Sequence, residues 1–103
     1  MSLKEEALQI IDQLYNDLQK DGQFVDSDIT DVLMLAYKKI NRKADVVPLM
    51  NRLSNYIYYT AFIRKITFSS QQNNYIRQIA TLGKSAGLNG VYRADYGDKS
   101  QFL

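Results

Sequence analysis

The side chains that most often perform acid–base or nucleophilic chemistry are missing or isolated in this chain. It contains no histidine and no cysteine, which removes the commonest general base near neutral pH, thiol nucleophiles and the usual zinc ligands. Asp28 and Asp31 share a helical face at i, i+3 spacing, but two acids in a first helical turn are typical partners of the helix dipole. Ser85 has no neighbouring base to activate it. We therefore predict no enzyme, cofactor, metal site or small-molecule substrate.

The eight tyrosines and the cations of the second half raise nucleic-acid binding as an alternative. A base-stacking groove needs aromatic side chains and cations together on one exposed surface. Tyr56 instead falls on an apolar helical stripe, and the net charge of +2 is far below the basic footprint of DNA-binding domains. Aromatic packing between helices is the favoured interpretation, and no nucleic-acid partner is expected.

A protein-binding module agrees better with the aromatic residues. Tyr58, Tyr59 and Phe62 cannot all be hidden on one narrow stripe, so they either pack under the C-terminal tail or form an exposed patch. The tail combines tyrosine and arginine, which are enriched in interface hot spots. It is either a strap across the domain with aromatic pegs or a binding surface, and a strap can also present such a surface.

The charges of the two halves of the chain differ in sign. Residues 1–47 contain six Lys/Arg and nine Asp/Glu, a formal charge of −3, whereas residues 48–103 contain seven and two, a formal charge of +5. One interpretation is two solvated faces, because charge balance says little about fold. The other is that the second half meets something anionic, such as lipid headgroups or an acidic protein patch.

The elements that would position these groups are four amphipathic helices. Apolar residues recur at spacings of three and four, which predicts helices over residues 2–20, 27–42, 48–64 and 70–86. Their apolar stripes include Leu3 at the start of the first helix and Ile63 at the end of the third. Short connections make neighbouring helices antiparallel. We predict one all-α domain, residues 1–103, an up-down-up-down four-helix bundle with an ordered non-helical tail over residues 87–103.

Capping residues mark where two of these helices begin. Ser2 precedes Glu5, and Ser69 precedes Gln72, each at the spacing of a capping box. At the boundary between the second and third helices, Pro48 is expected to open the third helix and to keep Val47 out of helical angles.

A glycine inside the fourth predicted helix needs a reason of its own. Gly83 costs about 1 kcal/mol there relative to alanine. We expect it either to permit the close approach of a neighbouring element or to mark a hinge.

No segment directs the chain across a membrane. The first six residues lack the basic and apolar regions of a signal peptide, and no apolar run approaches the ~20 residues that a membrane span needs. Together with the absence of cysteine, this predicts a protein of the reducing cytoplasm.

Four segments carry a resemblance to a known family. The tail sequence Gly87–Phe102, GLNGVYRADYGDKSQF, is its most specific part, and PLMNRL, NYIYYTA and LYND, which begin at residues 48, 55 and 14, add to it. With these segments the chain resembles the enterocin A immunity protein family, whose members protect bacteria from pediocin-like (class IIa) bacteriocins. The resemblance spans nearly the whole chain and is loosest in the second helix.

The resemblance implies a fold, a partner and candidate site residues. It implies a cytoplasmic antiparallel four-helix bundle that acts from the inside on the mannose phosphotransferase permease in complex with bacteriocin. The +5 charge of residues 48–103 would favour additional peripheral contact at the anionic inner leaflet. The C-terminal half of such proteins governs which bacteriocin is resisted. Carried over by position, the partner-binding residues are Tyr92, Arg93, Asp95, Tyr96, Asp98 and Lys99. The alternative function is a cytoplasmic helical adaptor or regulatory protein that binds another protein partner.

Overall fold

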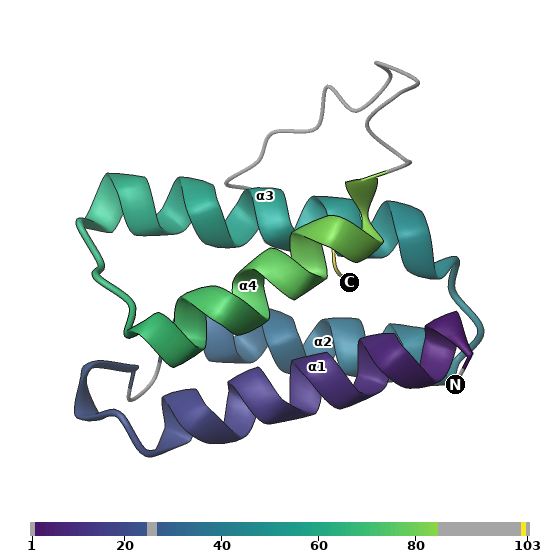
Figure 1. The fold of residues 1–103 in the computed structure, drawn as a ribbon, viewed down its shortest axis with the longest axis horizontal. Coiled ribbons are helices and arrows are strands. Elements are labelled where there is room, and N and C mark those ends of the chain that lie inside the picture. Colours follow the sequence, from purple (N-terminus) through teal and green to yellow (C-terminus); the bar gives the residue numbers. More distant parts are fainter. Residues whose placement is uncertain (1, 25–26, 85–101, 103) are drawn as a thin grey trace.

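Four antiparallel helices make up most of the computed structural model, which describes residues 2–24, 27–84 and 102. They are α1 (Leu3–Gln19), α2 (Asp28–Asn41), α3 (Val46–Arg64) and α4 (Ser70–Leu82), and a 3₁₀ turn, η1 (Gly22–Phe24), follows α1. Successive helices reverse direction, and no strand occurs in the described residues (Figure 1). The predicted all-α, up-down-up-down four-helix bundle is confirmed.

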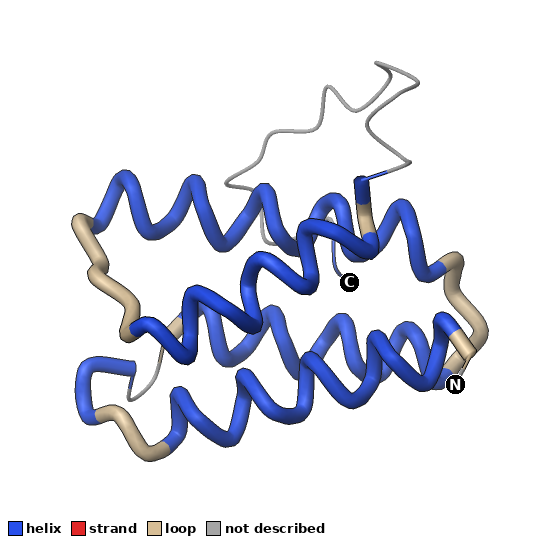
Figure 2. The backbone as a smooth tube through the Cα atoms, viewed as in Figure 1, coloured by secondary structure: helices blue, strands red, loops and turns tan. Residues whose placement is uncertain are grey.

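The helices enclose one core. Each helix contacts the next, and α4 returns to contact α1, with the connections gathered at the two ends of the bundle (Figure 2). The apolar stripe of α2 is fully buried, as its spacing predicts; its residues are Ile29, Val32, Leu33, Ala36 and Ile40. Two stripe predictions were wrong: Leu3 is 41% exposed and Ile63 is 57% exposed. Leu3 lies in the first turn of α1 and Ile63 in the last turn of α3. The last turn of α3 extends beyond the start of α4 (Figure 1), so α4 does not cover Ile63.

The predicted caps start the helices as expected. The Ser2 hydroxyl accepts a hydrogen bond from the backbone N–H of Glu5 at 3.1 Å. In the capping box of α4, the hydroxyl of Ser69 accepts from the N–H of Gln72 at 3.1 Å, and the Gln72 amide oxygen accepts from the N–H of Ser69 at 2.9 Å. These bonds satisfy donors that have no partner within a first helical turn.

The start of α3 differs from its prediction. Asp45 is the N-cap and α3 begins at Val46, so Val47 is helical and the expected break before Pro48 was wrong. Pro48 is the third residue of the helix, where an N–H would have no acceptor within the helix in any case. The N–H of Leu49 makes the first intrahelical bond, to the carbonyl of Asp45 at 3.4 Å. Proline is therefore accommodated two residues further into the first turn than predicted.

Gly83 allows α4 to end against the backbone of α3. A Cβ at this position would lie 2.5 Å from the Cα of Asn51 and 2.7 Å from the carbonyl carbon of Met50. These distances leave no room for any side chain, which confirms close approach rather than a hinge as the reason for this glycine. The helix ends at Leu82 with Gly83 as its C-cap, earlier than the predicted end at residue 86; residues 85 and 86 lie outside the described part.

Candidate functional site

The six residues predicted to bind the partner lie outside the residues that the structure describes. These are Tyr92, Arg93, Asp95, Tyr96, Asp98 and Lys99. The described residues do show how the chain is held on either side of them. Gly83 precedes the segment and packs against α3, and Phe102 follows it.

Phe102 is part of the hydrophobic core. Its side chain is 1% exposed, and its ring meets that of Tyr56 on α3 edge-on, with centroids 5.6 Å apart and ring planes at 83°. Asn51, against which Gly83 packs, lies five residues before Tyr56, about 7.5 Å along the helix axis. The segment that carries the predicted recognition residues therefore begins and ends against the same helix.

Four large apolar side chains of α3 are exposed. Tyr58, Tyr59, Phe62 and Ile63, which we call the outer face of α3, follow one another at i, i+1, i+4 and i+5 and so share one side of the helix. Their exposed fractions are 45%, 43%, 81% and 57%. Of the two arrangements that the sequence left open for the aromatic residues, the exposed patch is the one observed.

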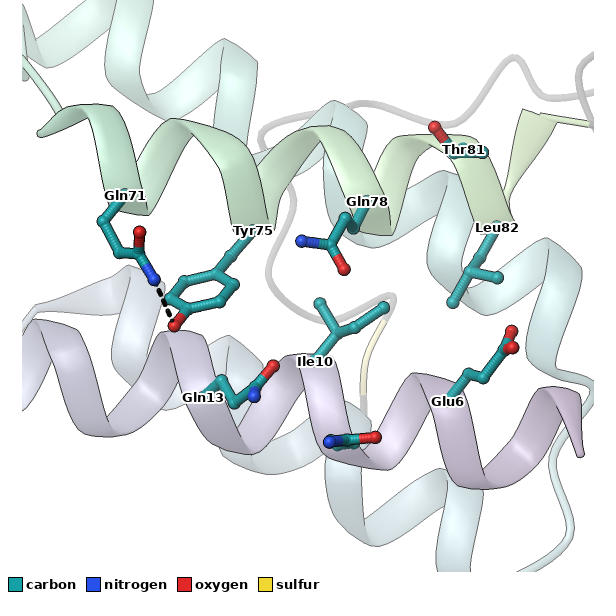
Figure 3. A pocket seen from close by; sticks show the side chains of 9 residues that line it. Glu6, Ile10, Gln13, Gln71, Tyr75, Gln78, Thr81 and Leu82 are labelled. Carbon is teal, nitrogen blue, oxygen red and sulfur yellow. Dashed lines mark hydrogen bonds between the residues drawn. The ribbon is translucent and has the colours of Figure 1, made fainter. Parts of the chain in front are cut away.

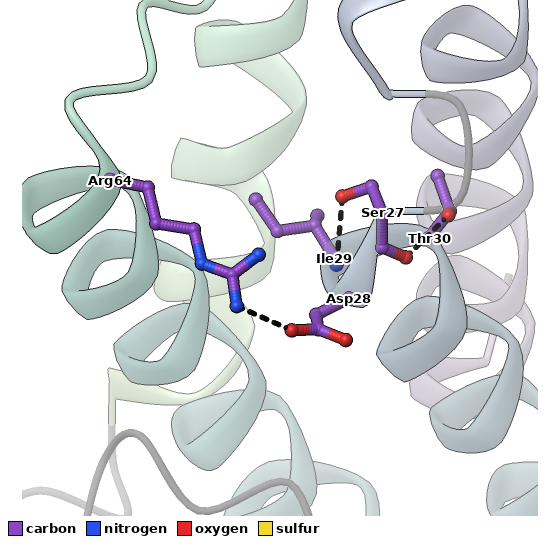
Figure 4. A network of polar contacts seen from close by, with 5 residues as sticks. All are labelled: Ser27, Asp28, Ile29, Thr30 and Arg64. Atoms are coloured by element: carbon purple, nitrogen blue, oxygen red, sulfur yellow. Dashed lines mark hydrogen bonds and ion pairs between the residues drawn. The ribbon is translucent and has the colours of Figure 1, made fainter.

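An ion pair joins the C-terminal end of α3 to the start of α2. The guanidinium of Arg64 donates to the Asp28 carboxylate at 2.7 Å, beside the Ser27 cap of α2 (Figure 4). Asp28 lies in the first turn of α2, as predicted for a dipole partner. Because both side chains are partly exposed, the pair contributes at most about 1 kcal/mol. Its consequence is positional, since it directs Arg64 towards α2.

Gln72 connects the start of α4 to the end of α1. Its side chain is 2% exposed, and its amide N–H₂ donates to the carboxylates of Asp17 at 3.0 Å and Asp21 at 3.2 Å. Hydrogen bonds from the side chain of Gln23, then from Gln72 and the backbone N–H of Gln23, hold the pKa of Asp21 below its ordinary value of 3.8. The lowered pKa keeps Asp21 an ionised acceptor for the cap of α4, which leaves it unsuited to general-acid chemistry.

A groove of about 640 Å³ runs between α1 and α4 (Figure 3). Its walls are mainly amide side chains with an apolar floor; the lining residues are Glu6, Gln9, Ile10, Gln13, Gln71, Tyr75, Gln78, Thr81 and Leu82. At one end the Gln71 amide lies 2.6 Å from the Tyr75 hydroxyl. Glu6 is its single carboxylate, so the groove can offer hydrogen bonds to a peptide but has no pair of groups for acid–base catalysis.

The described residues offer neither a metal site nor a membrane-spanning helix. They contain no group of three or more His, Asp or Glu side chains able to hold a metal ion. Within the same residues, no helix is both long enough and apolar enough to cross a bilayer.

Comparison with known proteins decides the family. The model of the bacteriocin immunity protein family matches residues 3–84, which comprise all four helices. The chain belongs to the bacteriocin immunity protein family. This confirms the resemblance found in the sequence, and the family of this immunity protein is one of helical bundles not known as enzymes.

Two curated relatives and one solved structure support the assignment. The "Probable mesentericin-Y105 immunity protein" of Leuconostoc mesenteroides is 49% identical over 76 residues, 74% of this chain and 67% of that protein. The "Probable leucocin-A immunity protein" of Leuconostoc gelidum is 47% identical over 75 residues, 73% of this chain and 66% of that protein. The chain thus matches about two thirds of the length of each.

The solved structure is that of EntA-im, a bacterial immunity protein conferring immunity to the pediocin-like bacteriocin enterocin A. It is 48% identical, with a TM-score of 0.65, and the match covers 92% of this chain and 98% of EntA-im. At this identity the agreement extends beyond fold to family.

Some features of this immunity protein had weak signals in the sequence. Ile63 is exposed beside Phe62 on the outer face of α3. Its position directly after Phe62 in the sequence was a weak sign of that exposure. Gln72 was recognised as a cap, but its bonds to Asp17 and Asp21 join residues far apart in sequence. Gln9 and Gln13 at i, i+4 spacing gave the only local sign of the groove wall on α1.

Proposed function

We propose that this immunity protein protects a cell from a pediocin-like bacteriocin by acting from the cytoplasm on the bacteriocin-bound mannose permease. The observation that carries the proposal is the 48% identity to EntA-im over 92% of the chain. The curated relatives, whose names refer to mesentericin Y105 and leucocin A, support the same class of function.

The geometry of the described residues favours binding over chemistry. The carboxylates of Asp17 and Asp21 accept hydrogen bonds from Gln72 in the cap of α4, and four of the nine residues that line the groove between α1 and α4 are glutamines. The largest exposed apolar side chains lie on α3, the helix against which Gly83 and Phe102, the two anchors of the C-terminal segment, both pack. Exposed apolar patches of this kind mark interaction sites.

The proposed recognition surface is the C-terminal segment held by these anchors. It includes Tyr92, Arg93, Asp95, Tyr96, Asp98 and Lys99. Its two anchors, Gly83 and Phe102, fix the ends of the segment relative to the bundle, which reduces the conformational entropy that binding would cost.

The test is a protection assay in a bacteriocin-sensitive strain that carries the mannose permease. Cells expressing the chain are titrated with leucocin A, mesentericin Y105 and enterocin A, the bacteriocins after which its relatives are named. A large rise in the inhibitory concentration of one or two peptides is expected, and it would also define the specificity. No rise for any of them, with folded protein present in the cells, would favour the alternative of an adaptor for another partner.

The permease part of the proposal has its own measurement. An affinity-tagged copy of the chain should co-purify with the permease from detergent-solubilised cells treated with the matching bacteriocin, and not from untreated cells. Protection without this co-purification would retain the immunity function and overturn the permease as the target.

A further inference from the structure

The hairpin formed by α3 and α4 has no negative side chain. From Val46 to Lys84 the sequence contains five Lys/Arg and no Asp or Glu, whereas nine of the eleven carboxylates lie in residues 1–45. The two helices α3 and α4 pack side by side, so the cations of the hairpin belong to one half of the bundle. This half is suited to approach an anionic surface.

The same hairpin carries the most exposed apolar surface among the described residues. On the outer face of α3, Phe62 is 81% exposed, and Tyr58 and Tyr59 are each exposed by more than two fifths. Lys65 follows the helix directly, three residues after Phe62, and is also exposed. Arg64 is directed to Asp28 instead. An aromatic patch therefore has a cation at its edge and no carboxylate within its own hairpin.

We infer that the outer face of α3 docks on an anionic lipid surface, with Phe62 and Tyr58 among the headgroups and Lys65 at the phosphates. Tyrosine and phenylalanine in an amphipathic setting occupy the boundary between headgroups and acyl chains, and lysine extends its charge towards the headgroups. A second copy of the chain is a poorer occupant, because two carboxylate-free hairpins of like charge would face each other across the interface.

This inference deepens the proposed function and rests on it only in the choice of membrane. A protein that acts on a permease from the cytoplasm must reach the anionic inner leaflet, and attraction of basic residues to that leaflet would concentrate it there. The contact itself needs neither bacteriocin nor permease. It can therefore be tested on the purified chain with vesicles alone, and its failure is distinguishable from a failure of the protection assay.

The first measurement uses the absence of tryptophan from the chain. The variant Phe62→Trp has a single tryptophan on the outer face of α3. Its emission should shift to the blue on addition of vesicles containing phosphatidylglycerol and should not shift with phosphatidylcholine alone. The matched control is Leu3→Trp, at an exposed apolar position on α1, which should show no shift with either vesicle.

The second measurement compares binding by co-sedimentation with the phosphatidylglycerol vesicles. Phe62→Ser should weaken binding about tenfold or more, the scale set by burial of one aromatic side chain, and Leu3→Ser should leave it unchanged. Lys65 has a left-handed backbone, with φ 55°, which asparagine tolerates. Lys65→Asn should therefore weaken binding several-fold without unfolding the helix end. Lys20→Asn, at the exposed C-cap of α1, should leave binding unchanged.

Three results would overturn the inference. One is an equal blue shift of the Phe62→Trp variant with both kinds of vesicle, and another is no shift at all. The third combines two observations on Phe62→Ser: it binds vesicles as well as the wild type does, and it loses a self-association that the wild type shows in sedimentation equilibrium. That result would assign the outer face of α3 to a second copy of the chain.

Discussion

The ring of Phe102 packs edge-on against the ring of Tyr56, with centroids 5.6 Å apart. Only two residues separate Phe102 from Lys99, the last of the predicted recognition residues in the C-terminal segment. Edge-to-face aromatic pairs add about 0.5–1.5 kcal/mol to the burial of the rings themselves. A residue near the end of the chain thus contributes to the same core as the helices.

Removal of this anchor should destabilise the whole bundle. Phe102→Ala is expected to lower the free energy of unfolding by about 3 kcal/mol, because the substitution removes a buried aromatic ring and leaves a cavity beside Tyr56. Urea denaturation followed by circular dichroism measures the change. Phe62→Ala is the matched control, since its 81% exposed ring should contribute less than about 0.5 kcal/mol. Equal stability of both variants would mean that Phe102 is not part of the core.

The contact of Gly83 with α3 predicts an asymmetry between two glycines. Gly83→Ala should cost about 2 kcal/mol or more, because its Cβ would overlap the main chain of Met50 and Asn51, which cannot move aside like a side chain. Gly22→Ala, where a Cβ would meet nothing within 4 Å, should change stability by less than about 1 kcal/mol. Thermal unfolding of the two variants tests this. A fully stable Gly83→Ala protein would contradict the close approach.

The parts of the fold that could be predicted from the sequence depend on local signals. The 3–4 spacing of apolar residues and the Ser69–Gln72 cap are readable within one or two turns, and both are confirmed. Leu3 and Ile63 continue their stripes equally well, yet they are exposed. Their burial depends on how far a neighbouring helix extends, and the periodicity of one helix contains no such information.

The candidate site illustrates the same limit in another way. The aromatic excess on α3 was visible because Tyr58, Tyr59 and Phe62 exceed what one buried stripe can hold. By contrast, proline alone does not fix where a helix begins, because a first turn accepts proline at more than one position. The sequence therefore predicts a start at Pro48, whereas α3 begins two residues earlier. The hydrogen bonds of Gln72 to Asp17 and Asp21 join the ends of two helices, and only the packing of α4 on α1 brings them together.

The cluster around Asp21 predicts a dependence of stability on acid. Hydrogen bonds from Gln23 and Gln72 lower its pKa in the folded state below 3.8. A carboxyl group with a lowered folded pKa stabilises the protein at pH values above its unfolded pKa, and this contribution is lost as the pH falls through the folded pKa. Asp21→Asn should therefore be less stable than the wild type at about pH 6, and the difference should shrink towards about pH 2.5.

Melting temperatures measured across this pH range provide the comparison. Asp12→Asn, at an exposed position of α1, is the control for the loss of one carboxylate. If the gap between Asp21→Asn and the wild type stayed constant down to the lowest pH, the ionised carboxylate of Asp21 would not be the acceptor that secures the cap of α4.

The proposed role of the C-terminal segment predicts that function and stability can be separated at Arg93. Arginine is among the side chains that contribute most at interfaces, and loss of one hot-spot residue costs about 2 kcal/mol or more of binding free energy. Arg93→Ala should therefore reduce protection against the matching bacteriocin about tenfold or more, while its melting temperature stays within about 2 °C of the wild type. Lys20→Ala, which removes a cation from the opposite half of the bundle, should protect fully. Full protection by Arg93→Ala at matched expression would exclude this arginine from the recognition surface, whereas a large fall in its melting temperature would assign it to holding the segment in place.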